Sequence, residues 1–259
     1  MQTIVPAEHD AIVERLRRAG CVFAQDEADV LLGSAATSGQ LESMIERRIG
    51  GQPLEHVVGW AAFAGLRVAV GEGVFIPRRR SELLVETART IMKPGDVVLD
   101  LCCGSGAVGM AIAAAVDVEL LAADIEPTAV CWARANVEPI GGMVYEGDLY
   151  DALPSRWHGQ IDVIVCNAPY VPDGEIDVLP REARLHEPLV TLSGGADGLD
   201  VQRRVIAAAD QWLTPGGHVL IETSEWQASQ TAELFRASGM DVEIVHDEDV
   251  DATVVIGKS

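Results

Sequence analysis

Four residues at 167–170, Asn-Ala-Pro-Tyr, follow the apolar run 161–165 and could hold a planar nitrogen group. An amide or exocyclic amine is a poor nucleophile because its lone pair is delocalised, so it gains from being fixed in line with its reaction partner. The Asn167 side-chain oxygen and the Ala168 carbonyl can each accept one N–H of such a group. Tyr170 can pack on its flat face, and Pro169 restricts the backbone. We expect these four residues to bind the acceptor, with Asn167 and Tyr170 as catalytic residues. Without further context, the same four residues would indicate only a turn.

A glycine-rich turn, Asp-Leu-Cys-Cys-Gly-Ser-Gly at 100–106, follows a second apolar run and leads into a helical pattern. Glycines at such a turn let a ligand approach the backbone. Gly104, Gly106 and Gly109 fit Gly-x-Gly-x-x-Gly, a spacing that serves a dinucleotide as well as another adenosine cofactor. The alternative is that these glycines only make a tight strand-to-helix turn.

Acidic residues at the ends of strand candidates favour one cofactor over the other. Asp124 lies where a carboxylate can accept hydrogen bonds from two ribose hydroxyls. Asp148 and Leu149 follow the next strand candidate, and we expect them beside the adenine, although a lone acid there is also typical of a solvated loop. Asp100 suits the amino group of a methionine-derived cofactor and would repel a pyrophosphate. The expected cofactor is therefore S-adenosylmethionine rather than NAD.

These residues must be positioned by a sheet, and the pattern from Val97 onward predicts one. Short apolar strand candidates alternate with helical stretches, which indicates right-handed crossovers and a doubly wound, mostly parallel sheet. Two further strands, separated only by Asp-Glu-Asp-Val-Asp, suit a terminal antiparallel pair. The strand candidates are 97–102, 118–124, 161–167, 218–223, 240–246 and 252–257.

The N-terminal part of the chain has a different pattern. Residues 11–20 and 41–51 show apolar residues at threes and fours and end in glycine, which predicts a small helical cap. Residues 63–77 alternate around Gly-Glu-Gly and predict a hairpin that links this cap to the sheet. The resulting boundaries are 1–60 for a helical substrate-docking domain, 61–80 for the linker and 81–259 for the cofactor-binding domain.

Composition limits the class of protein. The 259 residues are 48% hydrophobic, enough for one substantial core and a small extra domain. No apolar run reaches the roughly 20 residues that cross a bilayer, and no signal segment opens the chain, so we expect a cytoplasmic protein with no membrane partner. The net charge of −21 disfavours stable nucleic-acid binding. Five cysteines without Cys-x-x-Cys spacing predict no disulfide framework and no metal site, and we expect them to be small buried residues: Cys21, Cys102, Cys103, Cys131 and Cys166.

The chain resembles the PrmC/HemK-type protein-(glutamine-N5) methyltransferases, which modify peptide-chain release factors. The motifs at 100–106 and 167–170 carry the resemblance, together with 51–70, 74–86 and 186–206, and it runs from about residue 50 to the C terminus. It implies a seven-stranded, Rossmann-like class I methyltransferase sheet with an antiparallel C-terminal strand. It also implies methyl transfer from S-adenosylmethionine to the glutamine of a release factor's Gly-Gly-Gln loop. The cofactor positions of the family fall on Asp100, Leu101, Cys102, Cys103, Gly104, Asp124, Leu149 and Asn167, and its substrate-binding tetrapeptide falls on Asn167, Ala168, Pro169 and Tyr170.

The chain departs from this family in three places. Ala168 stands where the family has its first proline, which keeps the carbonyl and costs some rigidity. Arg79, Arg80 and Ser81 replace the usual Pro-Glu-Thr and make that loop more basic. The helical cap is shorter than the family's docking domain.

Three other functions are alternatives to glutamine methylation. The first is methylation of a nucleobase amine, because Asn-x-Pro-Tyr suits any planar NH2 group. The second is a non-catalytic module that binds S-adenosylmethionine or a ribosomal partner. The third, an NAD-dependent oxidoreductase, would leave Asp100 and the tetrapeptide unexplained.

Overall fold

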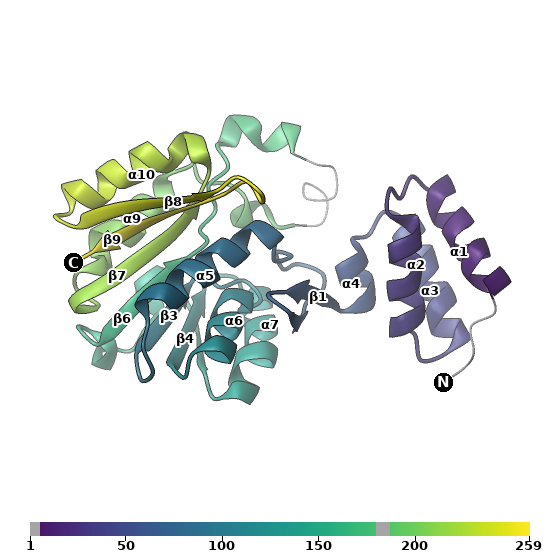
Figure 1. Cartoon of the computed structure of the whole chain (residues 1–259), viewed down its shortest axis with the longest axis horizontal. Helices are drawn as coiled ribbons and strands as arrows, with labels where there is room; N and C mark the ends of the chain where they lie inside the picture. Colours follow the sequence, from purple (N-terminus) through teal and green to yellow (C-terminus); the bar gives the residue numbers. More distant parts are fainter. Residues whose placement is uncertain (1–5, 180–186) are drawn as a thin grey trace.

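The computed structural model describes residues 6–179 and 187–259, and a seven-stranded sheet forms the centre of the larger body (Figure 1). Strands lie side by side in the order β5-β4-β3-β6-β7-β9-β8, parallel except for β9, which runs antiparallel to both neighbours. The mostly parallel sheet with its antiparallel C-terminal strand is as predicted. The strands are β3 (Val97–Leu101), β4 (Glu119–Asp124), β5 (Met143–Glu146), β6 (Ile161–Cys166), β7 (Leu213–Thr223), β8 (Asp241–Asp247) and β9 (Ala252–Lys258).

Helices cover both faces of this sheet because both faces of its strands are apolar. Within β3, Val98 packs in one cluster with residues of α5 (Glu82–Ile91) and α6 (Ala107–Ala115). Leu99 and Leu101 face the opposite cluster, which includes residues of α9 (Asp200–Ala209) and α10 (Glu225–Ala237). Helix α7 (Pro127–Val137) packs on β4 and β5.

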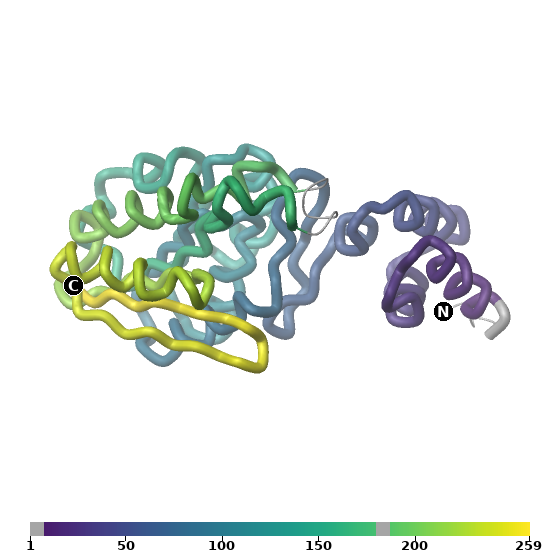
Figure 2. The backbone as a smooth tube through the Cα atoms, turned by 90° about the horizontal axis from the view of Figure 1, so that it is seen from above, coloured from purple at the N-terminus to yellow at the C-terminus, as the bar shows by residue number. Residues whose placement is uncertain are grey.

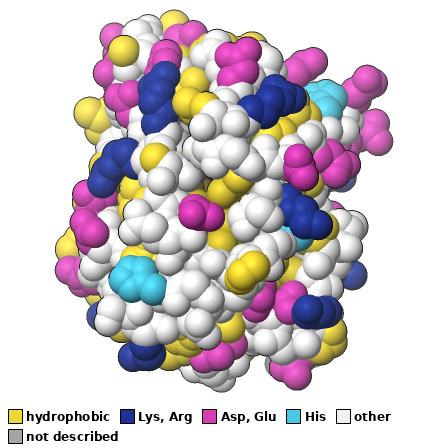
Figure 3. Space-filling view, turned by 90° about the vertical axis from the view of Figure 1, so that its left-hand side faces the viewer, with side chains coloured by type: hydrophobic (Ala, Val, Ile, Leu, Met, Phe, Trp, Pro, Cys, Tyr) yellow, Lys and Arg dark blue, Asp and Glu magenta, His cyan; other side chains and the backbone are white. Residues whose placement is uncertain are grey.

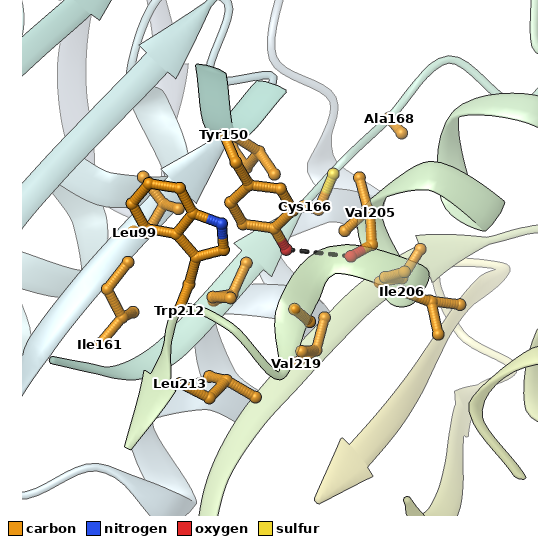
Figure 4. Packing of buried hydrophobic residues seen from close by; sticks show 14 of the residues in the cluster. Leu99, Tyr150, Ile161, Cys166, Ala168, Val205, Ile206, Trp212, Leu213 and Val219 are labelled. Carbon is orange, nitrogen blue, oxygen red and sulfur yellow. Dashed lines mark hydrogen bonds between the residues drawn. The ribbon is translucent and has the colours of Figure 1, made fainter. Parts of the chain in front are cut away.

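The cluster under α9 and α10 reaches the predicted acceptor-binding residues (Figure 4). Tyr150 stacks on Trp212 with ring centroids 5.6 Å apart and donates a 3.1 Å hydrogen bond to the Val205 carbonyl. Cys166 and Ala168 belong to the same cluster and are 0% and 1% exposed. The residues on both sides of Asn167 are thus anchored in the core.

The N-terminal residues form a separate small helical body beside the sheet (Figures 1 and 2). It contains α1 (Pro6–Arg18), α2 (Ala24–Ser34), α3 (Ser38–Ile49) and the short α4 (Leu54–Val58). Leu16, Leu31 and Ile45 are buried in its own apolar cluster. Helices were predicted in the regions of α1 and α3 but not in that of α2, where the short apolar residues Ala24 and Ala28 give a weak periodic signal.

The hairpin that joins the two bodies was predicted with its turn at the wrong position. It consists of β1 (Trp60–Phe63) and β2 (Leu66–Ala69), and it turns at Ala64 and Gly65 rather than at Gly-Glu-Gly. Both turn residues have positive φ, 47° and 76°, as a two-residue hairpin turn with matching twist requires.

A buried asparagine, Asn136 of α7, fixes this hairpin to the larger body. Its Oδ1 accepts from the Ala69 N–H, and its Nδ2 donates to the carbonyls of Ala69 and Ser105, all at 2.8–2.9 Å. The side chain therefore joins β2 to the glycine-rich turn that follows β3.

The cysteines are less uniformly buried than expected. Cys103 and Cys166 are buried and Cys21 and Cys102 are half-buried, but Cys131 is exposed because its position on α7 faces away from the sheet. Among the described residues, no helix combines the length and the apolarity needed to cross a membrane. The face shown in Figure 3 mixes acidic, basic and apolar side chains.

Candidate functional site

An open cavity lies at the carboxyl ends of β3, β4 and β6. The chain runs outward from β3 through β4 to β5 and then returns to place β6 on the other side of β3, so the connections after β3 and β6 diverge there. Such a switch point opens a crevice in doubly wound sheets. Most of the predicted site residues line the cavity: Asp100, Cys102, Cys103, Gly104, Asp124, Asp148, Leu149, Asn167, Ala168, Pro169 and Tyr170.

Leu101 and Gly106 were also predicted to bind the cofactor, but their surroundings are those of packing residues. Leu101 is fully buried in the core cluster under α9 and α10. Gly106 has φ 75° at the N-cap of α6, and a Cβ there would lie 2.7 Å from Val137 Cγ2. The glycine is thus required for close packing of the turn against α7.

Asp100 lies at the floor of the cavity and is 2% exposed. Burial raises the pKa of its carboxyl to about 8; the Gly109 N–H, which donates to Oδ2 at 2.8 Å, opposes this rise, and the charge of Asp124 adds to it. A Cβ on Gly109 would lie 3.1 Å from the same oxygen. The last glycine of the motif therefore makes room for Asp100.

Asp124 shapes the rim of the cavity next to the glycine-rich turn. Its Oδ2 accepts from the Gly104 N–H at 2.8 Å, and its Oδ1 accepts from the Glu126 N–H at 2.9 Å. Burial raises the pKa of this carboxyl and the two N–H groups oppose the rise. Each oxygen keeps a lone pair for a further donor, as two ribose hydroxyls would need.

Asp148 lines the cavity but is not a free acid. Arg204 of α9 donates to its Oδ2 at 2.8 Å, and Arg204 also lines the cavity. The backbone of Leu149 is left-handed, with φ 50°, and Leu149 also lines the cavity. Arg204 was not predicted as a site residue, because nothing in the sequence links residue 204 to residue 148.

Asn167 is held in one orientation by a residue far away in the sequence. Its Nδ2 donates to Ser81 Oγ at 3.0 Å. Ser81 is 1% exposed and lies at the start of α5. The bond leaves Asn167 Oδ1 as an acceptor, as binding of an NH2 group would require.

Residues 192–198 contact the end of the acceptor loop through backbone hydrogen bonds and close packing. Val171 N–H donates to the Leu192 carbonyl and the Gly194 N–H donates to the Val171 carbonyl, at 3.0 and 2.9 Å. Gly198 packs so closely that a Cβ would lie 2.3 Å from the Tyr170 carbonyl oxygen. This contact explains why residue 198 is a glycine. His186, the first residue of the resembling segment, lies outside the described residues.

Two charged residues that the sequence analysis did not assign to the site stand behind this loop. Glu222, at the end of β7, is 1% exposed, and its Oε1 lies 3.4 Å from the Tyr170 hydroxyl and 3.4 Å from Arg80 Nε. The Arg80 guanidinium lies over the Tyr170 ring, 5.7 Å from its centroid. The acidic residue in Ile-Glu-Thr of an otherwise apolar strand was the available signal.

The cavity fits S-adenosylmethionine by the chemistry of its donors and acceptors. Asp100 can take the amino group, Asp124 the ribose hydroxyls, and a Cβ on Gly104 would meet no heavy atom within 4 Å, so its backbone is open to a ligand. Among the described residues, no group of three or more His, Cys, Asp or Glu side chains could hold a metal ion.

Comparison with solved structures places the fold among methyltransferases. A methyltransferase from Pyrococcus furiosus aligns over 75% of this chain and 89% of its own at 16% identity, with a TM-score of 0.58. The Mtq2–Trm112 complex of E. cuniculi, responsible for methylation of the translation termination factor eRF1, aligns over 72% and 98% at 19% identity, with a TM-score of 0.53. Residues 67–182 match the model of the methyltransferase small domain. The fold and the site therefore define an S-adenosylmethionine-dependent methyltransferase.

Relatives of known name narrow the class to one family. The release factor glutamine methyltransferase of Mycolicibacterium smegmatis is 38% identical over 213 residues, 80% of this chain and 74% of the relative. That of Streptomyces coelicolor is 37% identical over 197 residues, 74% and 70% of the two chains, and that of Bifidobacterium longum is 32% identical over 252 residues, 90% and 85%. This chain belongs to the release factor glutamine methyltransferase family.

Proposed function

We propose that this protein methylates the side-chain amide nitrogen of the glutamine in the Gly-Gly-Gln loop of a peptide-chain release factor. The observation that carries this proposal is the meeting of two sets of residues in one cavity: Asp100 and Asp124 on the cofactor side, and Asn167 to Tyr170 on the acceptor side. S-adenosylmethionine supplies an electrophilic methyl group when bound. The proposed substrate is a translation factor, so we assign the reaction to the cytoplasm.

The residues of the acceptor loop orient a weak nucleophile. Asn167 Oδ1 and the Ala168 carbonyl accept the two N–H groups of the substrate amide and fix its plane, and the Tyr170 ring packs on one face. Orientation is the main contribution that the site can make, since the amide lone pair is delocalised. The nitrogen becomes acidic as it takes up the methyl group, and its proton passes to these acceptors or to water.

We further propose that the helical body, residues 1 to about 60, docks the release factor. The exposed pair Val22 and Phe23, 85% and 69% exposed between α1 and α2, supports this role. A protein substrate larger than its target loop needs such a second contact, because the cavity can accommodate only the loop itself.

The test is methyl transfer to a purified release factor from labelled S-adenosylmethionine. We expect label at the Gly-Gly-Gln glutamine by mass spectrometry and none in a factor with glutamine replaced by alanine. A cell extract, fractionated into protein and RNA after the same incubation, checks the nucleobase alternative. Label in RNA with an unlabelled release factor would refute the proposal.

A further inference from the structure

Glu222 is a buried carboxylate next to the acceptor loop that the proposed reaction does not use. Cys166 pairs with Ile221 across β6 and β7, so Glu222 lies level with Asn167 at the ends of these neighbouring strands. Burial raises the pKa of Glu222, while Ser81 and Arg80 lower it. Its Oε2 is buried and has no hydrogen-bond partner among the described residues. A buried acid is costly unless its neighbours compensate.

The neighbours of Glu222 are side chains that line the cavity. Its Oε1 faces the Tyr170 hydroxyl and Arg80 Nε, each at 3.4 Å. Burial raises the Glu222 pKa, and the side chain of Ser81 opposes this rise; Ser81 Oγ also accepts the 3.0 Å hydrogen bond from Asn167 Nδ2. Arg80, Ser81, Asn167 and Tyr170 all line the cavity, and Glu222 connects them from behind.

We propose that Glu222 is a positioning residue that fixes the direction of the hydrogen bonds reaching Asn167. This inference rests on the proposed function, because it explains how the acceptor side chains are held. An ionised Glu222 only accepts, so a Ser81 hydroxyl that donates to it offers its lone pair to Asn167. Asn167 must then present Nδ2 to Ser81 and Oδ1 to the cavity. The opposite orientation would present N–H groups to a substrate that also donates N–H groups.

The same carboxylate fixes the other side of the acceptor. It accepts a hydrogen bond from the Tyr170 hydroxyl. Its charge also holds Arg80, whose guanidinium lies over the Tyr170 ring, 5.7 Å from the centroid. A positive guanidinium on one face of the ring leaves the other face for the planar amide. Glu222 thus sets both the amide orientation and the position of the ring.

The test compares Glu222→Gln with Ser81→Ala and with a matched control, Glu243→Gln, an exposed glutamate on β8. Glutamine keeps the size of Glu222 but offers N–H donors, so the Ser81 hydroxyl is free to reverse. We expect the kcat for release-factor methylation to fall at least about tenfold in both site variants, with the KM for S-adenosylmethionine within about twofold of wild type. The double variant should lose no more than the worse single variant, since both act through Asn167. The control should match wild type.

A second measurement does not depend on turnover. The side-chain NH2 resonance of Asn167, assigned by its loss in Asn167→Ala, is read in 15N-labelled protein. We expect slow hydrogen exchange in wild type and faster exchange in Glu222→Gln and Ser81→Ala, with an unchanged Kd for S-adenosylhomocysteine. An unchanged exchange rate of the Asn167 NH2 group in both variants would overturn the inference. A lowered Tm with an equal loss of S-adenosylhomocysteine binding would also overturn it and leave Glu222 a structural residue. If wild type fails to methylate the release factor, the proposed function fails, and the Asn167 resonance still decides the role of Glu222.

Discussion

The backbone N–H of Gly109 donates a 2.8 Å hydrogen bond to Asp100 Oδ2 at the floor of the cofactor cavity. This single bond does not offset the burial of the carboxyl, and the pKa of Asp100 is raised to about 8. In the free protein near neutral pH, Asp100 is therefore largely protonated. The amino group of the cofactor is a cation and favours the charged carboxylate.

Cofactor binding should consequently depend on pH and release a proton. As pH falls below 8, the affinity for S-adenosylhomocysteine should fall by up to about tenfold per pH unit, because the carboxylate must first be formed. At pH 7 binding should release a proton, measured by calorimetry in two buffers of different ionisation enthalpy. Asp100→Asn should bind more weakly and without this proton release. Equal proton release in Asp100→Asn and wild type would assign the proton to another group.

Gly109→Ala tests the close approach of the helix to Asp100. The added Cβ would lie 2.8 Å from Leu120 Cδ1 and 3.1 Å from Asp100 Oδ2, so one of them must move. We expect a loss of about 1–3 kcal/mol in the free energy of unfolding and weaker S-adenosylhomocysteine binding. Gly33→Ala is the control: its Cβ would meet nothing within 4 Å on an exposed face of α2. That change should stabilise by about 0.5–1 kcal/mol and leave binding unaltered.

Asp124→Asn tests the two ribose acceptors. Both carboxylate oxygens of Asp124 already accept a backbone N–H group. In the asparagine variant, the NH2 group would face one of these N–H donors and could no longer accept a hydrogen bond from a ribose hydroxyl. S-adenosylhomocysteine binding should weaken by about 1.5–3 kcal/mol in calorimetry. Asp148→Asn should cost less than about 1 kcal/mol, since its partner Arg204 is half exposed to solvent. A larger effect at Asp148 than at Asp124 would reverse the assignment.

Substitutions in the acceptor loop should separate turnover from cofactor binding. Asn167→Ala should lower kcat about 10²-fold, because the substrate amide loses a positioning acceptor. Tyr170→Ala should be comparably severe, whereas Tyr170→Phe keeps the ring and loses only the 3.4 Å contact with Glu222. Methyl transfer to a Gly-Gly-Gln peptide and calorimetry with S-adenosylhomocysteine measure the two effects. A wild-type kcat in Asn167→Ala would contradict the positioning role of Asn167 and leave residues 167–170 as only a turn after a strand.

The exposed pair Val22 and Phe23 tests docking by the helical body. Replacing both by serine should raise the KM for an intact release factor at least about fivefold, because apolar contact area is lost. The KM for a Gly-Gly-Gln peptide should not change, since a peptide reaches only the cavity. Ile140→Ser, at a 49% exposed position on the larger body, is the control. Equal effects on protein and peptide would exclude a docking role.

The parts of the fold that the sequence could predict are those with local signals. Alternating apolar runs and helices indicated the sheet, and residues at strand ends, such as Asp100, Asp124 and Asn167, lie together because the ends of parallel strands meet at one edge. Packing between distant segments left no local signal. The Ser81–Asn167 and Arg204–Asp148 bonds join residues 86 and 56 positions apart. The hairpin turn was misplaced for a related reason: an alanine such as Ala64 gives no local sign of the positive φ that the turn imposes on it.

Asn136 has a consequence for how the two bodies can move. Its three hydrogen bonds fix the hairpin to the larger body and to the glycine-rich turn that follows β3. Contacts also join the end of the helical body to the segment after the hairpin: His56 Nε2 lies 3.2 Å from the Val74 carbonyl oxygen, and Gln52 Nε2 donates to Glu72 Oε1 at 2.8 Å. A tilt of the helices toward a bulky substrate would therefore have to break these contacts first, whereas the hairpin itself stays aligned with the glycine-rich turn.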